Sequence, residues 1–155
     1  MIGRLLRSTD FERVLRTRTR ASSTHFAVHH LPGPPSLPHK PAGEIGVLAK
    51  SGELSTGDAP PKLEPVDDLP SDGQKGVWLG TVVPKRHARR AVTRTLLKRQ
   101  IRLAVSARAG ALLGGLWVVR LRAPFDKTSF PSAASAALKI CARRELDVLL
   151  SSAVR

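Results

Sequence analysis

Hydrophobic residues near the start of the chain are spaced as on a helix. Phe11, Val14 and Leu15 follow one another by three and one positions and would share one face of a short helix. Residues 8–10 are Ser, Thr and Asp, whose side-chain oxygens are typical of a helix N-terminus. We therefore expect the first helix near residues 8–15, with Phe11 facing inward.

Three later segments have the patterns of strands. Residues 25–30 alternate weakly and residues 77–83 form a β-branched run; a proline follows each, and we expect these two strands to pair. Residues 116–122 carry apolar side chains on one face and two arginines on the other, as in a half-buried strand. The apolar residues of that strand are Trp117, Val119 and Leu121.

Two long segments without internal proline or glycine predict amphipathic helices. Residues 88–107 lie between two predicted strands, and the crossover is long enough for these strands to be parallel. Their apolar face would contain Leu97, Ile101, Ala104 and Val105. The last helix is expected from Pro131 onward, with its apolar stripe at Leu138, Ala142, Leu146 and Leu149. The pattern predicts one sheet with helices packed on it.

Residues 32–76 have a composition that does not support a packed core. They hold nine of the twelve prolines and seven of the twelve glycines, and seven acidic residues outnumber four lysines. Such a segment buries too little apolar surface to offset the entropy lost on ordering. We expect a disordered insertion at 32–76, between residues 1–31 and residues 77–155 of one folded domain.

Length and charge narrow the class of protein. About two thirds of the 155 residues remain outside the insertion, which is enough for one modest core. Lysine and arginine number 26 against 12 acidic residues, for a formal net charge of +14. Such a charge repels itself unless a polyanion is close, so nucleic acid is the first candidate partner.

Other features favour a protein of the cytoplasm without a membrane partner. No apolar run approaches the roughly 20 residues of a spanning helix, and the most basic stretch has no Trp or Phe anchor. Cys141 is the only cysteine, so no intrachain disulfide can form. The Arg-rich start of the chain contains Asp10 and Glu12, and we expect it to be mature sequence rather than a transit peptide.

The positive charge is concentrated in one segment. Residues 77–122 contain eleven lysines or arginines and no acidic residue. Arg94, Lys98 and Arg102 recur every four positions and would form a cationic stripe, with Arg99 beside it. The apolar face lies on another side, so the cations would face outward and suit a phosphate backbone. A second apolar set, which periodicity does not place, consists of Val92, Leu96 and Leu103.

The same segment carries a motif. Residues 80–86 (GTVVPKR) and 91–102 (AVTRTLLKRQIR) resemble the signature of the bacterial ribonuclease P protein family, whose core is an Arg-Asn-Arg helix. The chain departs from the signature at Thr95, in place of the usual Asn, and at Leu96, in place of the second Arg. The second departure removes an expected phosphate contact. The matching residues are Ala91, Val92, Arg94, Lys98, Arg99 and Arg102.

The resemblance implies an α+β fold in a single domain. The implied order is α-β-β-β-α-β-α, with a mostly four-stranded sheet and helices packed on it. This order has one strand more than the hydrophobic pattern predicts, and we expect a break within residues 78–85 to supply it. Residues 9–14 are similar to the first helix of that family, so the resemblance spans all but residues 32–76.

The resemblance also implies two RNA-binding surfaces. A sheet cleft beside the first helix would hold the 5′ leader of precursor tRNA, at Phe11, Leu15 and Phe26. Aromatic side chains there would stack on single-stranded bases without reading their sequence, and core packing is the alternative for both phenylalanines. The second surface would contact the catalytic RNA and the cleavage site through Lys85, Arg86, Arg89, Arg90, Arg94, Thr95, Lys98, Arg99 and Arg102.

The implied function is that of the protein component of ribonuclease P, a ribonucleoprotein endonuclease that removes the 5′ leader from precursor tRNA. The catalytic RNA would carry out hydrolysis with bound Mg²⁺, and the protein would supply no catalytic residue and bind no metal. The basic segment has no acidic residue and lacks any residue type that could hold a hydrolytic metal by itself. The five histidines show no metal-ligand spacing, and no carboxylate lies near His25 or His29 in the sequence to orient them.

Two alternatives belong to other classes of protein. A ribosomal or ribosome-associated protein that binds rRNA would suit the charge and size equally well, and the spacing of Lys98, Arg99 and Arg102 argues against it. A DNA-binding regulator would use residues 88–107 as a recognition helix. That helix has strands on both sides instead of a helix-turn-helix partner, so we do not expect DNA to bind.

Overall fold

The computed structural model describes residues 1–37 and 76–154. Most of the insertion expected at 32–76 lies outside the described residues. The described part contains β1 (Ile2–Arg4), α1 (Ser8–Arg16), β2 (Thr19–Ser22), β3 (Phe26–Leu31), β4 (Val77–Val82), α2 (Ala91–Ala107), β5 (Gly115–Leu121) and α3 (Ala136–Val154).

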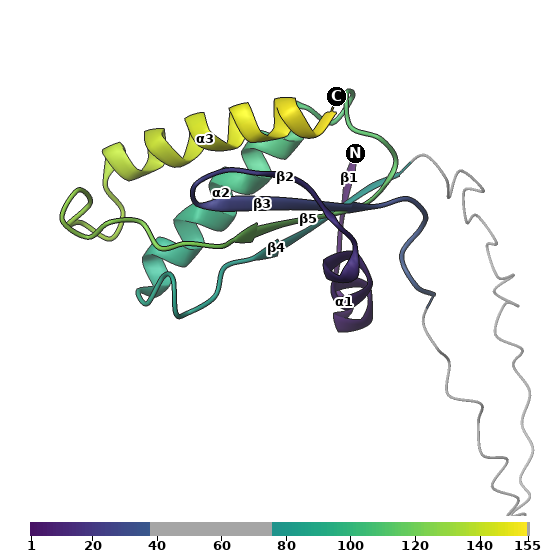
Figure 1. The fold of residues 1–155 in the computed structure, drawn as a ribbon, viewed down its shortest axis with the longest axis horizontal. Coiled ribbons are helices and arrows are strands. Elements are labelled where there is room, and N and C mark those ends of the chain that lie inside the picture. The colour runs from purple at the N-terminus through teal and green to yellow at the C-terminus, as the bar shows by residue number, and fades with distance from the viewer. Residues whose placement is uncertain (38–75, 155) are drawn as a thin grey trace, which may run out of the picture. The chain divides into compact units, whose positions relative to one another are not determined.

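The strands of the described region form one mixed sheet in the order β1-β4-β5-β3-β2. The central strand β5 is parallel to β4 and antiparallel to β3 (Figure 1). The expected pairing of β3 with β4 is therefore wrong, because β5 lies between them. The parallel pair expected around α2 is confirmed, since α2 connects β4 to β5.

The order α-β-β-β-α-β-α is confirmed, and an additional strand precedes it. The strand that the hydrophobic pattern missed is β2, which pairs with β3; no break divides β4. The additional strand, β1, pairs with β4 and makes the sheet five-stranded. Both missed strands are short edge strands without alternating hydrophobicity, so pairing with a neighbour defines them rather than local propensity.

The sheet separates two apolar clusters. Helices α2 and α3 cover one face, and α1 covers part of the other (Figure 1). The strand β5 is therefore buried on both faces except at Arg120, and the expectation of a half-buried strand is wrong because α1 folds back over it. The larger cluster includes Phe26, Leu97, Ile101, Trp117 and Leu146. The smaller cluster consists of Leu5, Val14, Leu116 and Val118.

Asp10 has a different role from the helix cap expected of it. No side-chain hydrogen bond caps α1. The Asp10 carboxylate is 1% exposed and accepts hydrogen bonds from Arg13 and from the backbone N–H and hydroxyl of Ser36. Burial alone would raise the pKa of this carboxyl, but the bonds from Ser36 and Arg13 bring it below its ordinary value. Asp10 thus ties the chain that follows β3 to α1.

Both long helices begin later than expected. The start of α2 is set by a turn in which the N–H groups of His87 and Ala88 donate to the Pro84 carbonyl, each at 3.1 Å. The helix α3 starts at Ala136 rather than at Pro131, and the Ser135 hydroxyl accepts a hydrogen bond from the Leu138 N–H at 3.1 Å. The buried faces expected for both helices are confirmed.

Candidate nucleic-acid interface

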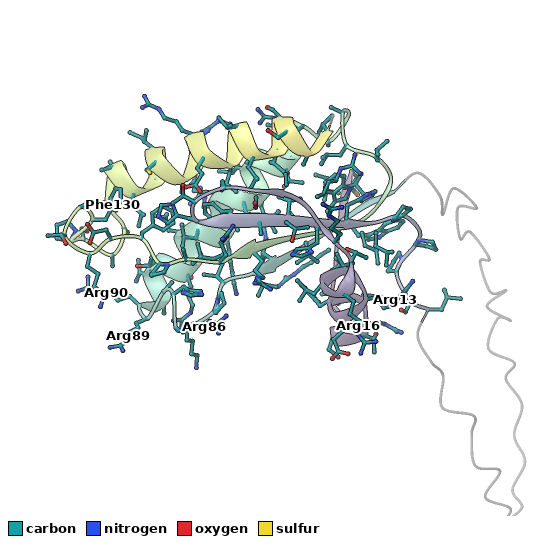
Figure 2. All side chains as sticks on the ribbon, in the orientation of Figure 1. Arg13, Arg16, Arg86, Arg89, Arg90 and Phe130 are labelled. Carbon is teal, nitrogen blue, oxygen red and sulfur yellow. The ribbon has the colours of Figure 1, made fainter. Side chains whose placement is uncertain are left out.

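Residues 85–90, here called the basic loop, place four cations outside the fold. Val83 and Ala88 are 8% and 5% exposed and anchor the chain in the core. The exposed side chains between and after these anchors are Lys85, Arg86, Arg89 and Arg90. Figure 2 shows Arg86 and Arg89 projecting on the side of the sheet away from α3.

Arg94 holds the basic loop instead of extending into solvent. Its Nη1 donates hydrogen bonds to the carbonyl oxygens of Ala88 at 3.0 Å and of Arg89 at 2.7 Å. The sequence predicts Arg94 as the first cation of an outward stripe, whereas the structure leaves it half-buried against the loop backbone. A guanidinium presents several donors in a fixed plane, so it can bridge two carbonyl groups at once.

The other residues of α2 that the sequence predicts to bind RNA lie on two sides of its solvent face. Lys98 is half-buried and Arg102 is exposed, and both continue the line of Arg94. Thr95 and Arg99 are exposed as well, but they line a groove of about 570 Å³ between α2 and α3. The expected stripe is therefore divided, with Thr95 and Arg99 turned toward α3.

The second apolar set of α2 is mostly uncovered. Val92 and Leu103 are 57% and 46% exposed, and Leu96 is partly buried against the larger cluster. All three line the groove between α2 and α3, together with the cations Lys139 and Arg143. The core face of α2 is formed by Leu97, Ile101, Ala104 and Val105.

Within residues 1–37 and 76–154, no carboxylate forms an ion pair with a cation of the basic loop or α2. The ion pairs of the described region are Arg13–Asp10, His25–Glu145 and Arg108–Asp147, and none of them includes a residue of either element. The helix α2 has no acidic residue in its first turn. An anion could therefore contact these side chains without displacing a carboxylate of the described region.

Two of the three residues expected in the leader cleft lie on one face of the sheet. Phe11 and Leu15 are half-buried against the smaller cluster beside α1. Phe26 is 0% exposed in the larger cluster on the opposite face, with its ring edge-on to Phe125 at 5.9 Å. The expectation for Phe26 is wrong, because alternate residues of β3 point to opposite faces and Phe26 points toward α2 and α3.

Phe11 lies directly over Gly80. A Cβ atom at Gly80 would come within 2.4 Å of Phe11 Cε1 and 3.2 Å of Leu5 Cδ1. Glycine therefore allows α1 to approach the sheet, which gives a structural reason for the first residue of the motif. The same face continues beyond Phe11 with Ala27, Val82 and Arg120, which are neighbours in register. We call Phe11, Leu15 and these three residues the α1-side surface.

Structural contacts account for three histidines. The Nδ1 atom of His25 lies 2.7 Å from a carboxylate oxygen of Glu145 in α3, so the expectation that no carboxylate is near is wrong. The rings of His29 and His30 contact the carbonyl oxygens of Thr17 and Gly114, each at 3.1 Å. Among the described residues, no group of three His, Cys, Asp or Glu side chains is placed to hold a metal.

The sequence reasoning missed the loop that precedes α3. Residues 124–133 come close to the basic loop and add Lys127 and Phe130 to its surroundings. One signal was present in the sequence, because two of the four phenylalanines fall in this short segment, at Phe125 and Phe130.

Within the described residues, no helix is long and apolar enough to cross a membrane.

Comparisons with known proteins point to one family. The family model for ribonuclease P matches residues 3–145. A ribonuclease P protein component of Burkholderia pseudomallei is 31% identical over 153 residues, which cover 99% of this chain and 83% of that protein. One of Bordetella parapertussis is 40% identical over 114 residues, which cover 70% of this chain and 84% of that protein.

Solved structures share the fold. A structure of the ribonuclease P protein from Staphylococcus aureus covers 96% of this chain and 92% of its own, with a TM-score of 0.52 and 15% identity. A second structure from that organism gives a TM-score of 0.55 and 16% identity, and the match covers 98% of this chain and 89% of that one. The extent of the family match and the identity to the bacterial relatives show that this chain belongs to the ribonuclease P protein family.

Proposed function

We propose that this chain is the protein component of ribonuclease P and that it binds the catalytic RNA through the basic loop and the solvent face of α2. The observation that carries the proposal is the set of exposed cations, without a carboxylate partner among the described residues, on a loop that the Val83 and Ala88 anchors and Arg94 hold in place. Several guanidinium and ammonium groups on an anchored backbone suit the regular spacing of RNA phosphates. The relatives bear the name of this component.

The 5′ leader of precursor tRNA would lie on the α1-side surface. Phe11 and Leu15 offer half-buried apolar contacts, and Arg120 adds a cation on the same face. Stacking on such groups does not depend on base identity, as a subunit that serves many precursors requires. Figure 2 shows Arg13 and Arg16 on α1, where they would add phosphate contacts.

The hydrolytic Mg²⁺ ions would be bound by the RNA partner. Magnesium takes oxygen ligands, whereas the basic loop and α2 present guanidinium and ammonium groups that only donate hydrogen bonds. The role of the chain is then to lower the electrostatic cost of bringing two RNA molecules together. The chain would raise the affinity for the substrate and would supply no group to the reaction itself. It would act in the cytoplasm, where precursor tRNA is processed.

The proposal is tested by cleavage of precursor tRNA with the cognate catalytic RNA at low Mg²⁺. The wild-type chain is compared with a triple variant, Lys98→Ala, Arg99→Ala and Arg102→Ala. Alanine favours the helix, so the fold should persist while three charges are lost. We expect the cleavage rate at subsaturating protein to fall by at least about tenfold, since each phosphate contact adds to affinity.

A matched control removes three exposed cations that lie outside the basic loop, α2 and the groove between α2 and α3, with Arg4→Ala, Arg18→Ala and Arg144→Ala. It loses the same charge, and we expect near-wild-type cleavage. A cleavage rate that is equal with and without wild-type protein would refute the proposal. If both triple variants lost the same cleavage rate, the effect would come from net charge rather than from the solvent face of α2. Binding to rRNA without any effect on cleavage would favour a ribosomal protein instead.

A further inference from the structure

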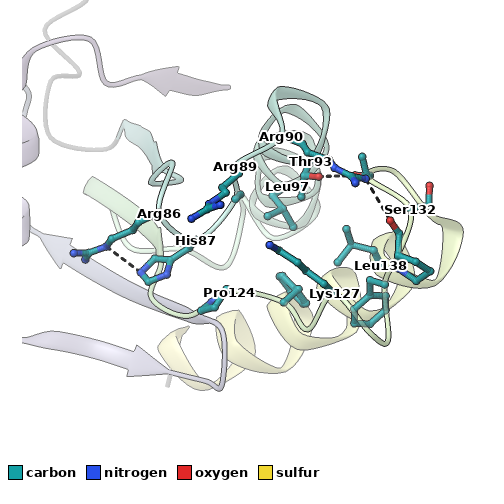
Figure 3. A pocket seen from close by; sticks show the side chains of 15 residues that line it. Arg86, His87, Arg89, Arg90, Thr93, Leu97, Pro124, Lys127, Ser132 and Leu138 are labelled. Carbon is teal, nitrogen blue, oxygen red and sulfur yellow. Dashed lines mark hydrogen bonds between the residues drawn. The ribbon is translucent and has the colours of Figure 1, made fainter.

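A pocket of about 450 Å³ lies beside the N-terminal end of α2 (Figure 3). Its walls come from the basic loop, the first turns of α2 and residues 124–133. Hydrogen bonds join these segments: the Thr93 hydroxyl donates to the Ala133 carbonyl at 2.7 Å, and Arg90 Nη1 donates to the Pro131 carbonyl at 3.3 Å. The pocket is therefore part of the fold and not a gap between independent loops.

The inner wall of the pocket is apolar and partly aromatic. Leu97 and Leu138 are 0% and 2% exposed where they line it. Phe125 is held by stacking on His25, with ring centroids 4.0 Å apart and planes 10° from parallel. Phe130 packs edge-on against Phe125 at 5.9 Å and remains half-buried. A fixed aromatic ring thus supports a second ring that is still partly accessible.

The rim of the pocket is cationic. The side chains of Arg89 and Lys127 are exposed and form no hydrogen bond or ion pair with any described residue. Figure 3 shows Lys127 directed toward α2 from the 124–133 loop, and Arg89 lines the pocket from the basic loop. Asp126 does not line the pocket; its carboxylate accepts hydrogen bonds from Thr128 and Ser129 in its own turn. The lining itself contains no acidic residue.

An aromatic wall beneath two uncompensated cations matches the chemistry of a nucleotide. A base can stack on a phenylalanine ring, and its phosphate can meet an arginine and a lysine. The volume is within the range of small-molecule sites and is too small for a base-paired helix, so the base would have to leave its stack. A surface that binds only backbone phosphates would not need the aromatic ring.

We propose that this pocket binds one unpaired, unstacked nucleotide of the RNA partner, with the base against Phe130 and the phosphate at Arg89 and Lys127. The inference rests on the proposed function, because it adds a defined subsite to the RNA-binding surface.

The test measures the affinity of the full chain for the cognate catalytic RNA. Phe130→Leu keeps an apolar side chain and removes the π face, and we expect it to weaken binding about tenfold without changing the salt slope. Phe130→Tyr keeps the ring and should bind within about twofold of wild type. Lys127→Ala should weaken binding and reduce the slope of log K against log salt by about one.

Two controls separate the pocket from general effects. Arg144→Ala removes an exposed arginine of α3 that lines neither the pocket nor the groove between α2 and α3, and it should leave affinity unchanged. Thermal unfolding checks that each variant is folded. Titration with uridine monophosphate should shift the NMR amide signals of residues 127–133 in wild type, more than inorganic phosphate does at equal concentration, and not in Phe130→Leu.

The outcomes distinguish this inference from the proposed function. If wild type binds the RNA and Phe130→Leu binds equally well, the nucleotide pocket is refuted while the proposed function stands. A loss in Lys127→Ala without a loss in Phe130→Leu would identify a phosphate contact only and would also refute the pocket. If wild type does not bind the RNA at all, both proposals fail.

Discussion

At the scale of single residues, the arginines of the basic segment have different tasks. Arg102 is exposed, whereas Arg94 donates two hydrogen bonds to the backbone that carries Arg89. Both Arg94 and Arg102 carry a positive charge, but Arg94 must also place its guanidinium within hydrogen-bond distance of two backbone carbonyls. A substitution that keeps the charge and changes the geometry therefore separates positioning from electrostatics.

We expect Arg94→Lys to weaken binding of the catalytic RNA about five- to tenfold, although the net charge is unchanged, because an ammonium on a flexible stem lacks the fixed planar direction of the guanidinium donors. Arg102→Lys should change affinity less than about twofold. Filter binding at fixed salt measures both. Equal affinities of the two variants would show that Arg94 acts through its charge alone.

Glu145 links α3 to the start of β3. Its carboxylate accepts hydrogen bonds from the Ser23 hydroxyl at 2.5 Å, the His25 N–H at 2.6 Å and the His25 ring at 2.7 Å. Burial alone would raise the pKa of Glu145, but these hydrogen bonds outweigh it and lower the pKa below the ordinary value of 4.5. The ionised form is therefore the one that the fold stabilises.

Because the pKa of Glu145 is lower in the folded chain than in the unfolded chain, its contribution is complete above its ordinary value and is lost as pH falls through the folded-state pKa. We expect Glu145→Gln to lower the free energy of unfolding by about 1 kcal/mol near neutral pH and by much less near pH 3. Urea unfolding of both proteins at the two pH values measures this. A difference that does not depend on pH would contradict the assignment.

At the scale of elements, the packing of α1 on the sheet depends on one glycine. Gly80 in β4 lies beneath the Phe11 ring, with too little space for a Cβ atom. Gly110, in the turn after α2, has no atom within 4 Å of the corresponding position. Neither glycine has a positive φ, so the two differ mainly in the space around them.

We expect Gly80→Ala to displace Phe11 and to lower the free energy of unfolding by about 1 to 3 kcal/mol. The matched control, Gly110→Ala, should be neutral or slightly stabilising, because it restricts only the unfolded chain. Denaturant unfolding of both variants measures the effect. Equal stabilities would mean that α1 can move away from the sheet at little cost.

At the scale of the whole molecule, the net charge of +14 acts in opposite directions on folding and on binding. Mutual repulsion of the cations destabilises the folded chain, and salt screens it over a distance of about 10 Å at 0.1 M. Salt also competes with the protein cations for RNA phosphates. The same ions should therefore strengthen the fold and weaken the complex.

We expect the melting temperature of the free chain to rise between about 20 and 200 mM NaCl, while its affinity for the catalytic RNA falls by at least about a hundredfold. Differential scanning fluorimetry and filter binding over one salt series measure both quantities. A melting temperature that falls with salt would show that internal ion pairs, rather than repulsion, dominate the electrostatics of the fold.

Elements with a strong hydrophobic period, and the position of the charge, can be predicted from the sequence alone. The buried faces of α2 and α3 and the parallel strands around α2 follow from local spacing and connection length. The family was visible in the spaced matches that end at Lys98, Arg99 and Arg102. These features are local in the chain, so a pattern of neighbours is sufficient to predict them.

Features that join distant segments of the chain become visible only in the folded structure. The pairing of β3 with β5, the edge strands β1 and β2 and the burial of Phe26 depend on which strands meet and which face a helix covers. The bridge from Arg94 to the basic loop and the pocket between α2 and residues 124–133 also depend on contacts across the fold. Local propensity carries no information about such contacts, because packing free energy is gained only when the partners come together.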